Sequence, residues 1–147
     1  MMASLGFDLL DRHVVSGGAD DPAAGRLTFA RLLERSASLA SGLGMLGVRP
    51  GDEVGVQVDD VDRVLVVCAC IRLGALPAPD GVVAVVPSDE GPVVRVGDDV
   101  HPLDLVRQAG SGDAATALGD DADGYREAVL RHAADVVEPL LERRPVL

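Results

Sequence analysis

The chain has 147 residues, of which 48% are apolar and only 2% aromatic, and its formal net charge at pH 7 is −11. This length and apolar content argue against a disordered chain and suit one domain with an aliphatic core. The acidic balance and the scarcity of rings argue against a nucleic-acid partner, because phosphates need a basic surface and single strands need stacking platforms.

Neither a membrane span nor an export signal is visible in the sequence. The longest fully apolar run, Val64–Ile71, is far shorter than the roughly 20 residues that a bilayer requires. The N-terminus lacks the basic and apolar regions of a signal peptide. Cys68 and Cys70 have neither zinc-ligand nor redox spacing, so we expect buried, reduced thiols in a cytoplasmic protein without a membrane partner.

The first half of the chain alternates between helical and strand patterns. We expect a short helix over Ser4–Val15 and a loop over 17–25, which together form an N-terminal segment of residues 1–25. Thr28 is a suitable N-cap for an amphipathic helix that extends to Leu46, because its hydroxyl can accept from first-turn amides. Gly47 should end this helix.

A strand and a second helix follow. Alternating valines predict a strand over Val54–Val58, and Asp60 is the expected N-cap of a helix that is apolar nearly all round and therefore buried. Gly74 should end that helix. Helix, strand and helix in this order predict a single α/β domain with a small, mostly parallel sheet flanked by helices.

The remainder predicts a hairpin and two helices. Val82–Val86 and Val93–Val96 are the expected hairpin strands, and Pro102–Ala109 is a short helix that completes a core of residues 26–109. Residues 110–122 read as a mobile loop. Residues 123–147 read as an amphipathic helix capped by Asp123, which Pro139 should kink or end early. Five positions form its apolar stripe: Tyr125, Val129, Ala133, Val136 and Leu140.

Four short blocks recur in a familiar order within residues 26–79. They are Leu27-Thr28-Phe29, Leu46-Gly47-Val48, Pro50-Gly51-Asp52 and the run RLGALPAP over Arg72–Pro79. This series resembles the N-terminal segment of the adenylate-forming (AMP-binding) enzymes, the superfamily of acyl-CoA synthetases and ligases. The resemblance implies the fold of their N-terminal subdomain. Six residues match structural signature positions only: Gly47, Pro50, Gly51, Asp52, Gly74 and Pro77.

The resemblance implies a reaction whose machinery this chain does not supply. Such enzymes join a carboxylate to AMP with a phosphate loop, magnesium-binding acids and a late catalytic lysine, and the sequence is truncated before these motifs. All thirteen basic residues are arginine, and no GxxxxGK[ST] stretch occurs. We therefore expect no catalytic, cofactor-binding or metal-binding residues, with ATP and Mg bound only if a partner chain completes the enzyme.

Several residue patterns resemble sites without the context that a site needs. Residues 42–47 spell GxGxxG, with Asp62 twenty residues after Gly42, but they end a helix instead of opening one, so we expect a thin helix face packed close to the sheet. Residues 120–124 resemble part of a calcium loop but lack its first and twelfth ligands. Three further sets have structural explanations or no metal-ligand spacing: Asp59, Asp60 and Asp62; His13, His101 and His132; Cys68 and Cys70.

Three hypotheses follow from this pattern. In the first, the chain is a non-catalytic binding or assembly module that meets a protein partner, or a second copy, through its C-terminal helix or a sheet edge. In the second, it is the N-terminal piece of a split ligase that activates a carboxylic acid with ATP once a partner chain completes it. In the third, it is a decayed copy without a function, although the well-patterned last helix argues against this.

Overall fold

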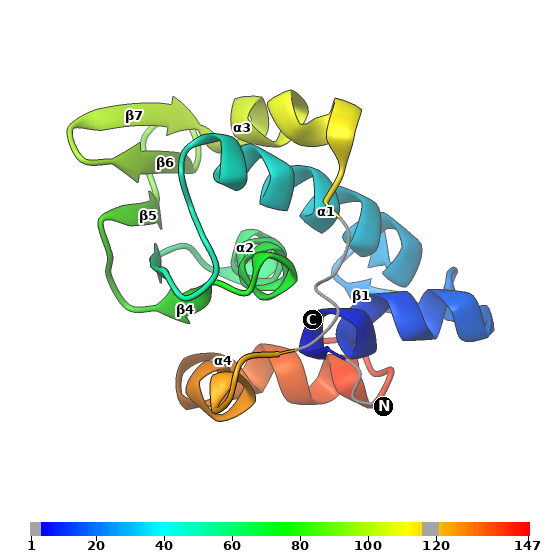
Figure 1. The fold of residues 1–147 in the computed structure, drawn as a ribbon. Coiled ribbons are helices and arrows are strands. Elements are labelled where there is room, and N and C mark those ends of the chain that lie inside the picture. The colour runs from blue at the N-terminus through cyan, green and yellow to red at the C-terminus, as the bar shows by residue number, and fades with distance from the viewer. Residues whose placement is uncertain (1–3, 116–120) are drawn as a thin grey trace.

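A computed structural model of the chain describes residues 4–115 and 121–147. A five-stranded sheet with the strand order β4-β3-β5-β6-β7 lies on one side of a set of helices, as Figure 1 shows. The predicted class, one α/β domain with a sheet flanked by helices, is therefore confirmed. No helix in the described ranges combines the length and the apolar character needed to cross a membrane.

The N-terminal segment is more ordered than the sequence suggested. Helical turns run through η1 (Phe7–Asp11) and η2 (Val14–Gly18), which extends the predicted helix. The predicted loop over 17–25 is wrong in part, because β1 (Pro22–Ala24) pairs antiparallel with β2 (Leu27–Thr28). Gly25 has a φ of 55°, a backbone conformation that allows the tight turn between these two strands.

The first long helix, α1 (Phe29–Met45), begins as predicted. The Thr28 hydroxyl accepts a hydrogen bond from the Arg31 amide at 3.2 Å. The helix buries Phe29 and Leu32, but its main neighbours are α2 (Asp60–Leu73) and α3 (Leu103–Gly110). The helix α1 therefore packs chiefly on these two helices, whereas the sequence predicted that it would pack on the sheet.

A parallel unit forms the centre of the sheet. The strand β3 (Glu53–Val56) leads through α2 into β4 (Leu76–Ala78), which lies parallel to it and which the sequence did not reveal. The N-cap of α2 is Asp59 and not Asp60, because Asp60 has already entered the helix, with an unusual φ of 56°. Gly74 ends α2 in the left-handed conformation, as predicted.

The connection from β4 to β5 (Val83–Val86) passes straight across the sheet. Both strands are parallel to β3 and flank it, so the four residues 79–82 cross over β3. A Cβ atom at Gly55 would lie only 2.9 Å from the Asp80 Cα atom. The absence of a side chain at Gly55 therefore lets a short segment replace the dozen or more residues of an ordinary crossover.

The second half of the sheet is antiparallel. The predicted hairpin of β5 and β6 (Val93–Val96) is confirmed, and β6 continues through a tight turn into β7 (Asp99–Pro102), which was not predicted. The sheet is thus mixed, with two parallel and two antiparallel pairings, instead of mostly parallel. Antiparallel hairpins replace the family-like alternation after residue 79.

Two further helices complete the domain. The helix α3 starts one residue after Pro102 and is followed by the 3-10 turn η3 (Ser111–Asp113). Residues 116–120 lie outside the described part, so the predicted mobile loop over 110–122 stays a prediction. The helix α4 (Tyr125–Leu141) is capped by Gly124, whose φ of 75° suits glycine, and not by Asp123.

The apolar stripe of α4 faces the chain's own core. All five predicted stripe residues are buried, and the helix packs against η1, α2 and β4. Its irregular residue is Ala133, whereas Pro139 lies in the last turn, and the helix ends at Leu141. Of the two predicted effects of Pro139, the early end is observed, two residues beyond it, whereas the irregular residue lies elsewhere, at Ala133.

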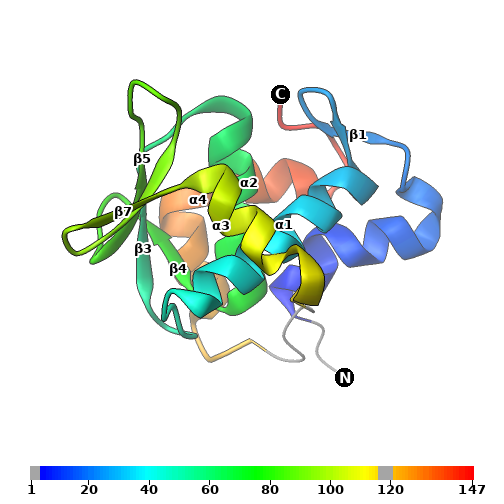
Figure 2. The same cartoon turned by 90° about the horizontal axis from the view of Figure 1, so that it is seen from above.

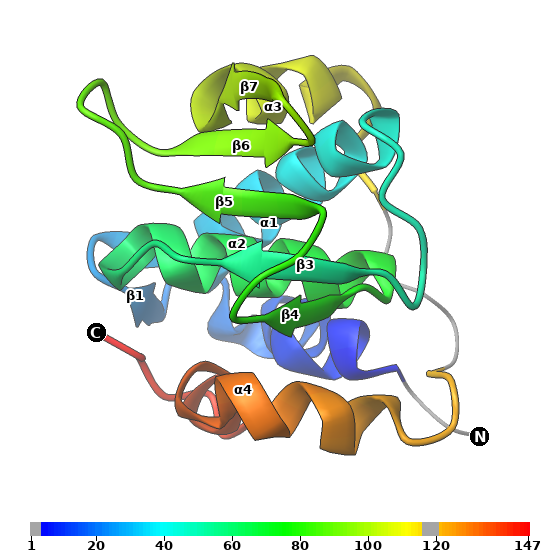
Figure 3. The same cartoon turned by 90° about the vertical axis from the view of Figure 1, so that its left-hand side faces the viewer.

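The two faces of the sheet differ in their surroundings. The helices α1, α2 and α3 lie on one side, where α2 covers the centre of the sheet, as Figure 2 shows from above, and α4 packs against β4 at the edge. Figure 3 looks onto the opposite side, where the strands face the viewer and no helix lies in front of them. This uncovered side is called the bare sheet face below and is defined by Ala84, Val86, Val93, Arg95 and Val100.

Candidate functional site

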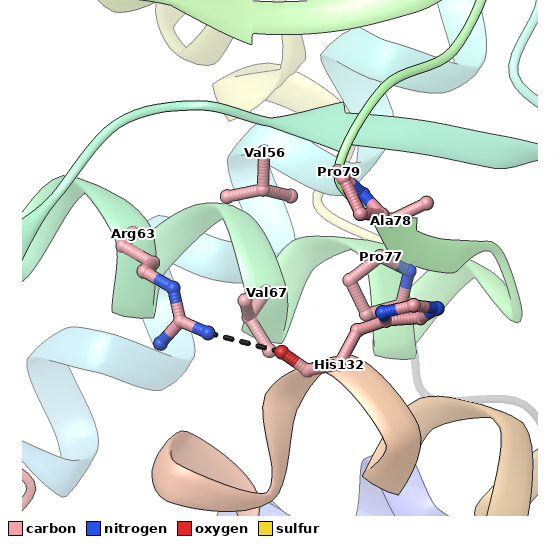
Figure 4. A pocket seen from close by; sticks show the side chains of 7 residues that line it. All are labelled: Val56, Arg63, Val67, Pro77, Ala78, Pro79 and His132. Atoms are coloured by element: carbon pink, nitrogen blue, oxygen red, sulfur yellow. Dashed lines mark hydrogen bonds between the residues drawn. The ribbon is translucent and has the colours of Figure 1, made fainter.

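A small cavity lies where the parallel strands end. It has a volume of about 230 Å³ and lies between the carboxyl ends of β3 and β4, the start of α2 and the middle of α4. Ligands of open α/β sheets bind beyond the carboxyl ends of the strands, so this is the position that the topology favours. Figure 4 shows the lining residues: Val56, Arg63, Val67, Pro77, Ala78, Pro79 and His132.

The one lining side chain that is always charged is already engaged within the chain. The Arg63 guanidinium donates to both carboxylate oxygens of Asp135, at 2.8 and 3.1 Å, and to the His132 carbonyl oxygen at 3.1 Å. These bonds join the first turns of α2 to α4, as the dashed line in Figure 4 indicates for His132. The cation is thereby neutralised by its own protein, so it serves to position the helices.

The chemistry available in this cavity is limited. Its walls are apolar apart from Arg63 and His132, and a volume of about 230 Å³ lies below the range of ordinary ligand pockets. No serine, cysteine or carboxylate lines it beside the imidazole, so it offers no pair of nucleophile and base. The cavity could hold a small apolar group but does not have the equipment to activate a carboxylate.

A larger hollow of about 490 Å³ lies near the start of β3, between the end of α1 and the hairpin. Its charged lining residues are Asp52 and Glu53, and no basic side chain lines it. Two carboxylates without a nearby cation repel phosphate groups, so this hollow is unsuited to a nucleotide. Neither cavity therefore resembles a phosphate-binding site.

The GxGxxG stretch has a packing role. Gly42 lies at the crossing of α1 and α3, where a Cβ atom would collide with the Val106 carbonyl oxygen. Gly110 makes the reciprocal approach, since its own Cβ atom would collide with the Ser38 carbonyl oxygen. The prediction of a thin helix face is confirmed, although its neighbour is α3 instead of the sheet. These glycines end a helix and face no ligand space of the kind that a dinucleotide needs.

The acidic clusters separate in the fold. Asp62 lies in the first turn of α2, and burial, followed by the charges of Asp104 and Asp60, raises the pKa of its carboxyl group. Asp121 does not serve α4, because it accepts from the Leu5 amide at 2.9 and 3.1 Å and so caps the first helical segment. Among the described residues, no three His, Cys, Asp or Glu side chains lie close enough together to hold a metal ion.

The histidines and cysteines are dispersed, and most are buried. His13 lies under the end of α4, where its Nε2 atom is 2.7 Å from the Leu140 carbonyl oxygen, and burial lowers its pKa. His132 lines the small cavity and His101 lies on β7, so the three imidazoles share no site. Cys68 and Cys70 are unpaired and buried in α2, and burial raises the pKa of the Cys70 thiol to about 12.

Two polar side chains join distant parts of the chain, although the sequence analysis assigned Arg72 no such role and placed Tyr125 only in an apolar stripe. Arg72 is buried in α2 and donates to both carboxylate oxygens of Asp11 and, at 2.7 Å, to the Ala115 carbonyl oxygen. The Tyr125 hydroxyl donates to the Ala75 carbonyl oxygen at 2.6 Å, and burial raises its pKa. An arginine within an otherwise apolar helix was the available signal, because such a charge needs an internal partner.

Comparison with known proteins relates part of this architecture to a large enzyme family. The family model of the "AMP-binding enzyme" matches residues 11–80, which contain η2, α1, the β3-α2-β4 unit and the Arg72–Asp11 pair. Residues 11–80 are therefore similar to a segment of the AMP-binding enzymes. The family segment thus begins earlier than the 26–79 stretch that the motifs indicated.

Curated members of this family are much longer than the chain. An acetyl-coenzyme A synthetase of Chromobacterium violaceum is 34% identical over 79 residues, which cover 48% of this chain and 12% of that protein. The acetyl-coenzyme A synthetase of Burkholderia mallei is 35% identical over 79 residues, again 12% of its length. The chain therefore spans about an eighth of these AMP-binding relatives.

Solved structures share the fold over a larger part of the chain. A long-chain-fatty-acid–CoA ligase of Archaeoglobus fulgidus has a TM-score of 0.59 and 23% identity, and the match covers 78% of this chain and 32% of that one. The structure of VinN with 3-methylaspartate has a TM-score of 0.55 and 18% identity, covering 80% and 41%. At these identities, the likeness concerns the fold alone.

Proposed function

We propose that the chain is a non-catalytic binding or assembly module built on the N-terminal segment of an adenylate-forming enzyme. The observation that carries this proposal is the unequal covering of its sheet. One face closes a complete core with the chain's own helices, whereas the other has no covering helix (Figure 3). A segment that folds around one sheet face and leaves the other uncovered is suited to docking.

The chemistry of the side chains supports a role without independent adenylation. The chain has no lysine, and the cavity at the strand ends offers one arginine that is already paired with Asp135. Adenylation needs cations that follow the charge developing on the transferred phosphate. ATP and magnesium would therefore be bound by another polypeptide, if they are bound in the assembly at all.

The exchange of pyrophosphate into ATP tests this proposal. The purified chain is incubated with ATP, Mg²⁺, labelled pyrophosphate and acetate or longer carboxylic acids, beside the Chromobacterium violaceum acetyl-coenzyme A synthetase as the active control. We expect exchange by the control and none above background by the chain. Exchange that follows the chain through purification and depends on an added acid would contradict the proposal.

A second function is favoured by the identity of the relatives. Because the acetyl-coenzyme A synthetases match over 79 residues at 34–35% identity, the chain could be the N-terminal piece of a split ligase. The test mixes the chain with the Chromobacterium violaceum enzyme lacking its own matched segment. Restored acetate-dependent exchange would favour the split ligase, whereas binding without exchange would favour the assembly module.

The packing of the chain weighs against a decayed copy. In the described ranges, every buried side-chain nitrogen and oxygen has a hydrogen-bond partner. Such completeness is the mark of a selected core, because an unpartnered buried polar group costs about 1–3 kcal/mol. The unpaired thiols of Cys68 and Cys70 support a reducing, cytoplasmic setting for this module.

A further inference from the structure

The bare sheet face combines exposed valines with an acidic border. Gly55 and Ala84 lie on this face, because a Cβ atom at Gly55 would meet the Ala84 Cβ atom and the Asp80 backbone. Arg95 pairs with Ala84 across β5 and β6, and Val100 pairs with Arg95 across β6 and β7, so both side chains project to the same side. Val86 and Val93, two residues along, share that side.

The apolar part of the face is accessible to solvent. Val100 is 57% exposed, and Val86 and Val93 are half-buried beside it. Val82 precedes β5 at the border of the face and is 80% exposed. On the covered side of the same strands, Val85 and Val94 are fully buried, although Val83 and Val96 at the ends are half-buried. On the bare side Ala84 is fully buried, so the exposure there belongs to the valines that surround it.

Acidic side chains surround these valines at both ends of the hairpins. From residue 76 to residue 102 the chain has one basic residue, Arg95, and its guanidinium donates to the Asp80 carboxylate at 3.3 Å. The exposed acids are Asp80 in the crossover, Asp89 and Glu90 in the β5–β6 loop, and Asp98 and Asp99 in the β6–β7 turn. The border of the face therefore carries a negative field without a free cation of its own.

The edges of the sheet are poorly suited to pairing with another strand. The β7 edge is four residues long and contains Asp99 and Pro102, while the β4 edge contains Pro77 and lies against α4. Short edges with proline and charge discourage strand addition. The apolar stripe of α4 is also buried, so the face is the better surface of those that the sequence suggested.

We propose that the bare sheet face docks a protein partner that presents apolar side chains bordered by lysine and arginine. Complementary charge selects this occupant, since a second copy of a chain of net charge −11 would place one acidic border against another. The proposal rests on the assembly role stated above and specifies its surface. It makes binding sensitive to salt, because the border pairs are exposed to solvent.

Site-specific photo-crosslinking tests this surface. The probe is p-benzoylphenylalanine placed at Val100 of the full chain in its native cells, with the same probe at Val15 as the control. Val15 is 79% exposed and lies in η2. We expect a protein cross-link from Val100 and not from Val15, at a partner peptide in which apolar residues adjoin Lys or Arg. Neutralising Asp89, Glu90 and Asp98 should lower the yield about tenfold.

Other outcomes would overturn the proposal. These are equal cross-links from both positions, a cross-link to a second copy, an acidic or uncharged partner peptide, or no cross-link at all. Circular dichroism of the probe variants checks that each is folded. A basic partner unrelated to AMP-binding enzymes would support the proposed surface but contradict assembly with a ligase chain. A ligase partner cross-linked only from Val15 would support that assembly but contradict the proposed surface.

Discussion

The two faces of the sheet are made from the same strands, but helices pack on only one of them. On the covered face, Val54, Val85 and Val94 are fully buried beneath the helices. On the bare face, the corresponding positions are Gly55, Ala84 and Arg95, with the β4–β5 crossover above them (Figure 3). At the centre of the sheet, large aliphatic residues therefore lie on the helix side, and small or charged residues lie under the crossover on the other side.

This difference indicates how a chain that matches only a short segment of much longer enzymes can fold. The relatives are about eight times longer than the matched region, yet the helices α1, α2, α3 and α4 of this chain close one core without further sequence. The long-range ties come from Arg72, Tyr125 and Arg63, each of which joins α2 or its neighbouring strand to a distant segment. The bare face is where additional polypeptide could bind without disturbing that core.

The largest expected loss of stability comes from a charge placed on the covered face. Val94→Asp would bury a carboxylate among aliphatic side chains and should lower the free energy of unfolding by about 4 kcal/mol, or prevent folding. Val100→Asp, on the opposite face, should change it by less than about 0.5 kcal/mol. Urea unfolding followed by circular dichroism measures both. Equal losses for the two variants would contradict the distinction between the faces.

The helix layer behind the covered face is the next target. Gly42→Ala forces a methyl group against the Val106 carbonyl and should cost about 3 kcal/mol. Gly44, two residues on in the same helix, has only Leu73 at 4.0 Å, so Gly44→Ala should stabilise the chain by up to about 1 kcal/mol. Chemical unfolding measures the stability of both variants. The packing interpretation requires a loss at position 42 and none at position 44, whereas a nucleotide-binding role for the glycines requires neither.

A third pair compares a buried ionic tie with an exposed one. Asp11→Ala leaves the Arg72 guanidinium buried with only the Ala115 carbonyl, and should cost about 2 kcal/mol, since Asp11 itself is partly exposed. Asp21→Ala removes an exposed partner of Arg143 and should cost less than about 1 kcal/mol. Thermal unfolding at matched pH compares them. A larger loss for Asp21→Ala would contradict this order.

The crossover on the bare face has a smaller expected effect. Gly55→Ala pushes a methyl group towards the Asp80 backbone and the Ala84 methyl group, at a cost of about 1.5 kcal/mol. Gly112→Ala is the control, since no atom outside its neighbours lies within 4 Å of its Cβ position, and it should be nearly neutral. If Gly55→Ala proves as neutral as the control, the short connection does not lie tightly on β3.

The smallest effect is a dependence of stability on pH. Because burial lowers the pKa of His13, the unfolded chain binds its proton more readily than the folded chain does. The corresponding stability is present above the unfolded pKa of about 6.5 and is lost as the pH falls through and below that value. Urea midpoints at pH 7.5 and 5.5 should therefore differ less in His13→Asn than in the parent chain. An identical pH response would contradict this assignment.

The sequence predicted the helix-rich half of the fold better than the strand-rich half. Thr28, Gly47 and Gly74 mark helix ends through contacts with residues close to them in the sequence. For this reason α1 and α2 were predicted nearly in full. The strands β1, β4 and β7 have three or four residues and contain one proline each, which hides them from periodicity. Pairing with distant strands, and not local preference, makes them strands.

The site expectations were limited in the same way. The packing role of Gly42 and the burial of Cys68 and Cys70 follow from residue type and helical context, and the structure confirms both. The sequence did not indicate that Asp121 caps the first helical segment, because only the fold brings Leu5 against it from 116 positions away. Which face of the sheet would stay bare also depends on where the helices pack, which no local pattern contains.

Thiol labelling tests the central claim, that one sheet face closes the core while the other is open. Cys68 and Cys70 are buried and serve as internal references, and one additional cysteine is introduced by Val94→Cys or by Val100→Cys. With 5,5′-dithiobis(2-nitrobenzoate) at neutral pH, the account predicts rapid reaction of the thiol added at position 100. The thiol added at position 94, like Cys68 and Cys70 in both variants, should react only as the chain unfolds. Protection at position 100 in the purified chain, or rapid reaction at position 94, would contradict it.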